Sequence, residues 1–299
     1  MSDRSTAPAD EARVVVGVDG SEPSLRALDM AAEEADRRGA ALEMLYSASW
    51  PRRSRVPVTE SDLDRIRVAA AVVLDDAGQR AQQRVPGLRT IPRIHTESLP
   101  ADALVASSRT AALTVVGTRG HGGFSGLLVG SVSLRVAVHA QGPLLVVGDS
   151  REKETAERGS VLVGLNSEAD EPAVRFGFEE AARRGASLRV LHAWSLPRMP
   201  GRLQLPPREA EQAREAASEL VRGAVHRLSG EHPGVSVSAD EKGGSPPATL
   251  IEASRTADVM IVAVHRSTRR RLGLQLGPVA HAVLHHAHCP VVTVPTPTG

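Results

Sequence analysis

The chain has 299 residues, 41% of them hydrophobic and only 2% aromatic, so its length suits two domains with cores of small aliphatic side chains. No apolar run reaches the roughly 18 residues of a membrane helix, and the formal net charge of +1 gives no global attraction to nucleic acid or to a membrane. The single cysteine, Cys289, excludes an internal disulfide and fits a reducing cytoplasm. Residues 1–11 are polar, and we expect a flexible terminus without a signal peptide.

In chain order, the first half alternates short apolar runs with longer helical patterns. Strands are predicted near 13–18, 41–47, 90–96, 113–117 and 143–148, and helices near 22–38, 60–84, 100–109 and 130–140. Pro23 lies where a first-turn proline is tolerated, and Gly39 lies where a helix end needs a left-handed residue. Such alternation predicts an α/β fold with a parallel sheet covered by helices on both faces.

The second half repeats the first. The segment 13–19 returns at 160–166, and the segment 142–147 returns at 289–294. Strands of the second copy are predicted near 160–165, 187–193, 234–240, 258–264 and 290–295. We therefore expect two tandem domains, 12–148 and 159–295, each with five parallel strands, joined by a charged linker at 149–158.

A glycine-rich loop follows the fourth predicted strand. Gly117 and Gly120 are followed, after nine further residues, by Gly130 and Ser131, where a helix is predicted to begin. Glycines let the backbone approach an anion closely, and the amide groups and dipole at a helix start favour negative charge. Asp19 ends the first strand, and parallel strands end at one edge of a sheet, so Asp19 and Gly117 should lie at the same edge.

These residues resemble the nucleotide-binding branch of the universal stress protein family. Its phosphate motif is Gly, two residues, Gly, nine residues, Gly, then Ser or Thr, and here it is complete as Gly117, Gly120, Gly130 and Ser131. The resemblance spans nearly the whole chain as a tandem pair. It implies two Rossmann-like domains of the adenine nucleotide alpha hydrolase type, with ATP held in the first.

The resemblance also implies which residues contact ATP. Asp19 would lie at the base or ribose end, where it could also hold Mg²⁺ through the phosphates, and Ser47 stands where the family usually has an apolar residue. The full set of implied contacts is Val18, Asp19, Ser47, Gly117, Arg119, Gly120, His121, Gly130, Ser131, Val132 and Ser133. Arg119 and His121 would add positive charge, although a solvated loop is an equally good interpretation of Arg119.

The second copy departs from the motif. Asn166 replaces the aspartate, Ala263 and Arg266 replace the first two glycines, and Leu276-Gly277-Pro278 replaces Gly-Ser-Val. Proline removes an amide donor, and the lost glycines restrict the loop. We therefore predict a weak or empty second site. Side chains of Arg266 and Arg269–Arg271 form a basic loop that could still attract an anion.

Other residue patterns give weaker indications. His281, His285 and His288 have spacing that would place three imidazoles on one helix face, the minimum for a metal site, but no carboxylate on that helix completes the set. A surface or interface face is the favoured interpretation. No nucleophile elbow, P-loop lysine or zinc-protease motif is present.

Three functions remain open at this stage. The first is a nucleotide-dependent regulator that acts through conformation, through dimerisation by the last strand of each copy, and through an unknown protein partner. In the family such strands mediate dimerisation, so we expect the two copies to pair within one chain and chains to pair again as a homodimer. The second is a slow ATPase or an ATP-using transferase of the same fold. The third, a scaffold that never binds nucleotide, is disfavoured by the complete glycine motif.

Overall fold

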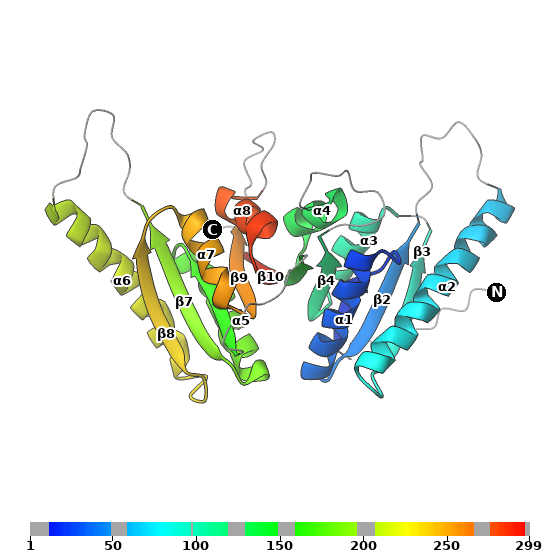
Figure 1. The fold of residues 1–299 in the computed structure, drawn as a ribbon, viewed down its shortest axis with the longest axis horizontal. Helices are drawn as coiled ribbons and strands as arrows, with labels where there is room; N and C mark the ends of the chain where they lie inside the picture. The colour runs from blue at the N-terminus through cyan, green and yellow to red at the C-terminus, as the bar shows by residue number, and fades with distance from the viewer. Residues whose placement is uncertain are drawn as a thin grey trace, which may run out of the picture.

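The computed structural model describes residues 12–48, 59–96, 98–118, 129–148, 159–195, 207–265 and 276–296. Two α/β domains lie side by side, with the chain passing once from the first to the second (Figure 1). Among the helices of the described residues, none combines the length and apolar character needed to cross a bilayer.

The first domain alternates strands and helices as its sequence predicts. Its elements are β1 (Arg13–Gly17), α1 (Glu22–Arg37), β2 (Ala41–Ser47), α2 (Glu60–Arg84), β3 (Thr90–His95), α3 (Pro100–Ser107), β4 (Leu113–Gly117), α4 (Ser131–His139) and β5 (Leu144–Val147). Every predicted strand and helix of this half is confirmed, with ends that differ by a residue or two. Pro23 lies in the first turn of α1, and Gly39 has φ 57°, as expected.

The second domain follows the same plan with two additional short 3₁₀ helices. Its elements are β6 (Ser160–Leu165), η1 (Glu168–Asp170), α5 (Glu171–Arg184), β7 (Ser187–Trp194), α6 (Pro207–Ser229), β8 (Val237–Gly243), α7 (Pro246–Ala253), η2 (Ser254–Thr256), β9 (Val259–His265), α8 (Pro278–His286) and β10 (Val291–Thr296).

The predicted strand at 234–240 is misplaced, because the observed strand β8 begins only at Val237. The preceding residues form turns after α6, in which the Val235 amide donates to the His232 carbonyl. The His232 ring also stacks on Phe178 of α5, with ring centroids 5.4 Å apart. The local turn at Pro233 and Gly234 therefore occupies the start of the predicted strand, and β8 begins after it.

All ten strands belong to one sheet, in the order β3-β2-β1-β4-β5-β10-β9-β6-β7-β8. Strands are parallel within each half, and the halves join where β5 and β10 pair antiparallel, with Val291 opposite Val146. The two domains are therefore paired within the chain through their last strands, as predicted. The two outer edges of the sheet are β3 and β8.

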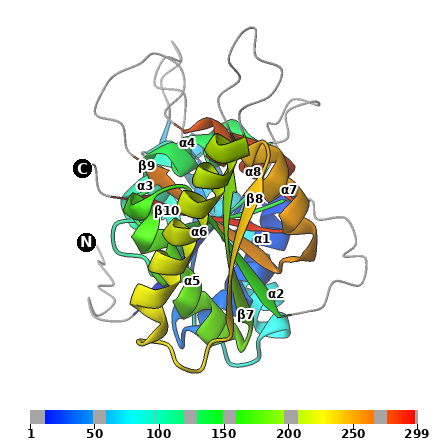
Figure 2. The same cartoon turned by 90° about the vertical axis from the view of Figure 1, so that its left-hand side faces the viewer.

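Helices cover both faces of the sheet. One apolar cluster includes Val14, Leu28 and Phe178 and lies beneath α1, α2, α5 and α6, whereas a second includes Val15, Leu104 and Met260 and lies beneath α3, α4, α7 and α8. Figure 2 shows α5 and α6 on one side of β7 and β8, and α7 on the other. Successive strand residues point to opposite faces, so the runs of Val, Leu and Ile supply both cores.

A cluster of charged side chains joins α1 to α5 across the domain junction. Glu34 and Glu180 have 0% and 1% exposed side chains, and each carboxylate contacts arginines of both domains. Arg38 donates hydrogen bonds to both Glu34 and Glu180. Arg184 also donates to both carboxylates, to Glu34 at 2.5 Å and to Glu180 at 3.3 Å. The cluster has near-twofold symmetry, and its buried carboxylates are fully paired, which is the condition for tolerating buried charge.

Candidate functional site

The carboxyl ends of β1 and β4 form the candidate site of the first domain. These strands are parallel neighbours, with Val16 opposite Val115, and the chain order of the sheet reverses between them. Open α/β sheets bind ligands in the crevice at such a reversal. The prediction that Asp19 and Gly117 lie at one edge is therefore confirmed, since both follow directly from these two strands.

The turn between β1 and α1 is organised by side chains. Ser21 is the N-cap of α1, and its hydroxyl and its backbone amide both donate to Oδ1 of Asp19, at 2.5 Å and 3.0 Å. The Asp19 amide in turn donates to Oγ of Ser24 at 3.3 Å, and Gly20 takes φ 81° in the bend. The half-buried carboxylate of Asp19 is thus held at the rim of the crevice by the first turn of α1.

Gly117 is required by close packing at the end of β4. A Cβ atom at this position would lie 2.5 Å from the Pro23 carbonyl oxygen of α1, well inside contact distance. The carbonyl oxygen of Gly117 accepts a 2.6 Å hydrogen bond from the buried hydroxyl of Ser133. Gly117 therefore brings the starts of α1 and α4 close to the end of one strand.

Helix α4 begins at this same place. Gly130 is its N-cap, with φ −74° and ψ 163°, and as a glycine it supplies no side-chain cap to the amides of Ser131, Val132 and Ser133. The Gly130 amide donates to the Thr118 carbonyl at 2.5 Å, which holds the helix start beside β4. First-turn amides without a side-chain cap form an anion site, because they carry the positive end of the helix dipole.

Val18 and Ser47 lie at the ends of β1 and β2. Val18 is 4% exposed, and its amide donates to the Leu45 carbonyl at 3.0 Å. Ser47 donates its hydroxyl to the Ser98 carbonyl at 2.8 Å, linking β2 to the segment before α3. The hydroxyl found where an apolar residue was expected thus has a structural partner. Sequence reasoning missed this bond, because Ser98 lies 51 residues away.

Three expected site residues, Arg119, Gly120 and His121, lie outside the described residues. The same holds for the terminus at 1–11, the linker at 149–158, and the basic loop of Arg266 and Arg269–Arg271. For the first domain, the structure thus brings together Asp19, Gly117 and the start of α4.

The corresponding edge of the second domain carries a buried carboxylate. Asp170, in the short helix η1, is 2% exposed, and its Oδ2 accepts the amides of Asn166 and Ser167 at 2.6 Å and 3.3 Å. Its Oδ1 lies 2.7 Å from Nε2 of His265 at the end of β9, and Nδ1 of that ring lies 2.8 Å from the Thr296 hydroxyl. A chain of contacts therefore runs from the end of β6 through β9 to β10, and its negative charge disfavours a phosphate here.

The start of α8 differs from that of α4 in a second way. Its N-cap is Gly277, and Pro278 occupies the first turn, so one amide donor is missing. Ala263 stands in β9 at the register position of Gly117 in β4. These features support the prediction of a weak second site.

The histidines of α8 do not form the predicted row of three. His281 and His285 stack with ring centroids 4.5 Å apart, but the helix ends at His286, so His288 lies beyond it. Placing all three on one helix face was therefore wrong, because a helix of this length stops short of His288. Within the described residues, no group of three or more His, Cys, Asp or Glu side chains is arranged to hold a metal ion.

Comparison with known proteins identifies what the chain resembles. The family model described as "Universal stress protein family" matches residues 12–148 and 157–295. Universal stress protein Rv1996 of Mycobacterium tuberculosis is 30% identical over 311 residues, covering 95% of each chain. A universal stress protein from Archaeoglobus fulgidus has a TM-score of 0.68 at 17% identity and covers 96% of this chain and 99% of its own. A universal stress protein in complex with cAMP covers 47% of this chain and 99% of its own, at 30% identity and a TM-score of 0.36.

Proposed function

The chain belongs to the universal stress protein family, and from that premise we propose that its first domain binds ATP and that the protein is a nucleotide-dependent stress regulator. In this proposal the triphosphate lies against the start of α4, and the nucleoside extends along the ends of β4 and β1. The second domain binds no nucleotide and serves as the structural partner of the first.

The observation that carries the proposal is the start of α4. Its N-cap, Gly130, supplies no side-chain cap to the first-turn amides, and these amides lie beside Gly117 at the point where the strand order reverses. A phosphate chain supplies the negative charge and the acceptor oxygens that such a helix start lacks. The hydroxyl of Ser131 is exposed at the same helix start, where it can donate to a phosphate oxygen.

The remaining proposed contacts with ATP lie along the crevice. Asp19 is proposed to accept a hydrogen bond from the ribose, since its carboxylate is held at the rim, and Val18 provides the apolar floor for the base. Arg119, Gly120 and His121 belong to the loop that would close over the phosphates. Ser133 acts indirectly, because its hydroxyl positions the Gly117 carbonyl.

Magnesium is proposed to bind through the phosphates of ATP. Oδ1 of Asp19 already accepts two hydrogen bonds from Ser21, and the described residues offer no cluster of three metal-binding side chains. We therefore propose a magnesium ion that binds together with the nucleotide and is coordinated by a single protein carboxylate, that of Asp19, directly or through water.

We propose that nucleotide binding regulates the protein by changing its conformation. Ligand bound only to the folded form stabilises it by mass action. The last strands, β5 and β10, already pair within the chain, so a homodimer would use another surface. Edge strand β3 contains Pro92, which lacks an amide donor and limits pairing with another strand. A protein partner would read the nucleotide state in the cytoplasm, which suits a chain with one cysteine.

A matched pair of variants tests the proposal. Gly130 and Gly277 are the N-caps of α4 and α8, with closely similar backbone angles. In Gly130→Asp, the new carboxylate would cap the amides and repel the triphosphate. Two unit charges 4 Å apart at a protein surface interact by about 4 kcal/mol, so we expect ATP affinity to fall by at least about 100-fold.

Stability should change by only a few tenths of a kcal/mol, because aspartate and glycine are both accepted N-caps. Isothermal titration calorimetry on the full chain measures the affinity, and thermal unfolding checks the fold. Gly277→Asp is the control and should bind ATP like the parent protein. Unchanged affinity in folded Gly130→Asp would refute the phosphate site at α4.

A further inference from the structure

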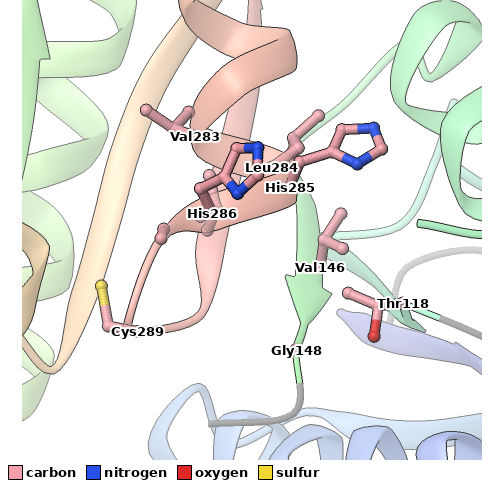
Figure 3. A pocket seen from close by; sticks show the side chains of 10 residues that line it. Thr118, Val146, Gly148, Val283, Leu284, His285, His286 and Cys289 are labelled. Carbon is pink, nitrogen blue, oxygen red and sulfur yellow. The ribbon is translucent and has the colours of Figure 1, made fainter. Parts of the chain in front are cut away.

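A cavity of about 250 Å³ lies where the two domains join, next to the end of β4. The first domain contributes Thr118, Val146 and Gly148 to its wall. The second contributes the end of α8 and the start of β10, as Figure 3 shows. We call this cavity the junction pocket; its lining residues are Thr118, Val146, Gly148, Val283, Leu284, His285, His286, Ala287, Cys289 and Val291.

Imidazoles are the ionisable groups that distinguish this pocket. The rings of His285 and His286 lie on the side of α8 that faces Val146 and Thr118 (Figure 3). Nε2 of His285 is buried and has no hydrogen-bond partner among the described residues. A buried polar nitrogen without a partner costs free energy, which a ligand that bonds to it would recover.

The described part of the pocket wall provides no counter-charge for these rings. Of the described residues that line it, none carries a carboxylate. Glu252 of the neighbouring helix α7 instead pairs with Arg255 at 3.0 Å. Burial lowers the pKa of His285, and the nearby rings of His281 and His286 lower that pKa further. An anion in the pocket would reverse both effects, since it would stabilise the protonated ring.

The first domain has no such imidazole cluster at the equivalent place. Helices α4 and α8 align through equivalent backbone bonds, from Ala140 to Val136 and from Ala287 to Val283. This alignment places Val138 at the position of His285. It also places Leu134 at the position of His281, so two of the three imidazoles of α8 have aliphatic counterparts.

We propose that the junction pocket binds a small oxyanion, such as inorganic phosphate or a short carboxylate, against the imidazoles of His285 and His286. The negative end of the α8 dipole favours protonated histidine in the last turn. That helix end also repels an anion, so in this proposal the two positive imidazoles outweigh the repulsion. Anion binding and protonation then assist one another, so the anion binds more tightly as pH falls. The proposal does not rest on the proposed ATP site, although Thr118 lines the pocket and its carbonyl also accepts the Gly130 amide.

The test is an NMR titration of the full chain with labelled histidines. The probe is inorganic phosphate, compared with chloride at equal ionic strength. We expect saturating phosphate to raise the pKa of His285 by about one unit, which by linkage means about tenfold tighter binding to the protonated form. His288 is exposed and outside the pocket, so its pKa should stay constant.

Substitutions that copy the equivalent first-domain residues make the test more specific. His285→Val copies Val138 and should abolish the phosphate response of His286, whereas His288→Gln copies Gln141 and should preserve the response of His285. Gly130→Asp should also preserve it, which separates this site from the ATP site.

Three results would overturn the proposal. The first is no phosphate effect on His285, or an equal effect on His288. The second is a response to Zn²⁺ without one to phosphate, which would make the pocket a metal site. The third concerns Asp149, which follows Gly148 in the sequence. If Asp149→Asn lowers the pKa of His285 without added anion, the counter-charge belongs to the chain itself.

Discussion

The two domains share one sheet plan but differ at the edge where their first and fourth strands end. Strands β1 and β4 pair in the same register as β6 and β9, with Val16 opposite Val115 and Val163 opposite Ile261. At the end of β1 the chain turns directly into α1, whereas after β6 it inserts η1 and the buried carboxylate of Asp170. A duplicated fold has thus kept its core while its loops have diverged.

The same comparison separates what holds the protein together from what is proposed to bind a ligand. Glu34 and Glu180 occupy equivalent places and make equivalent bonds across the junction. The starts of α4 and α8 are equivalent in position but not in chemistry. Symmetric sites should therefore respond equally to mutation, and asymmetric sites should not.

The largest effect is expected at the buried charge cluster. Glu34→Gln removes the buried carboxylate shared by Arg37, Arg38 and Arg184, which keep only Glu33 or Glu180 as charged partners. Breaking buried ion pairs by removing one partner costs about 3–5 kcal/mol. Glu180→Gln should cost the same within error. Urea unfolding of both full-length variants measures this. A loss below about 1 kcal/mol in either variant would contradict the role of the cluster.

The cluster also predicts acid sensitivity. Burial alone would raise the pKa of Glu34, but Arg184, Arg38 and Arg37 outweigh it, so the pKa is lowered from 4.5. A carboxyl with a lowered folded pKa contributes stability above its unfolded pKa and loses it as pH falls through the folded value. Stability of the parent protein should therefore drop below about pH 4.5, and Glu34→Gln should show a smaller drop. Equal pH profiles would contradict this.

A smaller effect is expected at the end of β4. Gly117→Ala places a methyl group against the Pro23 carbonyl, and overpacking of this kind costs about 1–3 kcal/mol. The matched change in the second domain, Ala263→Gly, should cost only about 0.5–1 kcal/mol through backbone entropy. Thermal unfolding compares the two variants. If Gly117→Ala is as stable as the parent protein, the close approach of α1 to β4 is wrong.

The smallest effect is expected in the core of β4. Oγ1 of Thr114 is buried and has no hydrogen-bond partner in the described part of the chain, and the register of β9 places Met260 at the equivalent position. Thr114→Val keeps the shape and removes the unpaired hydroxyl, so stability should rise by about 1 kcal/mol. Thr114→Ser retains the hydroxyl and serves as the control. Denaturant midpoints that rank serine above valine would contradict this expectation.

Strands, helices and the location of the site could be predicted from local sequence patterns. Apolar runs and glycine positions are local signals, which is why Gly117 and the start of α4 were predicted to lie together. The start of β8 was misplaced although a local turn signal was present, since Pro233-Gly234 form a turn in which the Val235 amide donates to the His232 carbonyl.

The charge cluster at the junction was also missed. Glu34 and Arg38 look like an ordinary exposed helix pair until α1 and α5 are known to face each other. A usable signal was the repetition of Glu34 and Arg37–Arg38 as Glu180 and Arg183–Arg184. The role of Asp170 was missed for a similar reason, because its partner His265 lies on a distant strand.

Native mass spectrometry of the full chain, titrated with ATP and magnesium, tests the central difference between the domains most directly. We predict that one nucleotide binds per chain, that Gly130→Asp loses it, and that Gly277→Asp retains it. Two nucleotides per chain would show that the second crevice is functional, and none would show that the start of α4 is not a phosphate site.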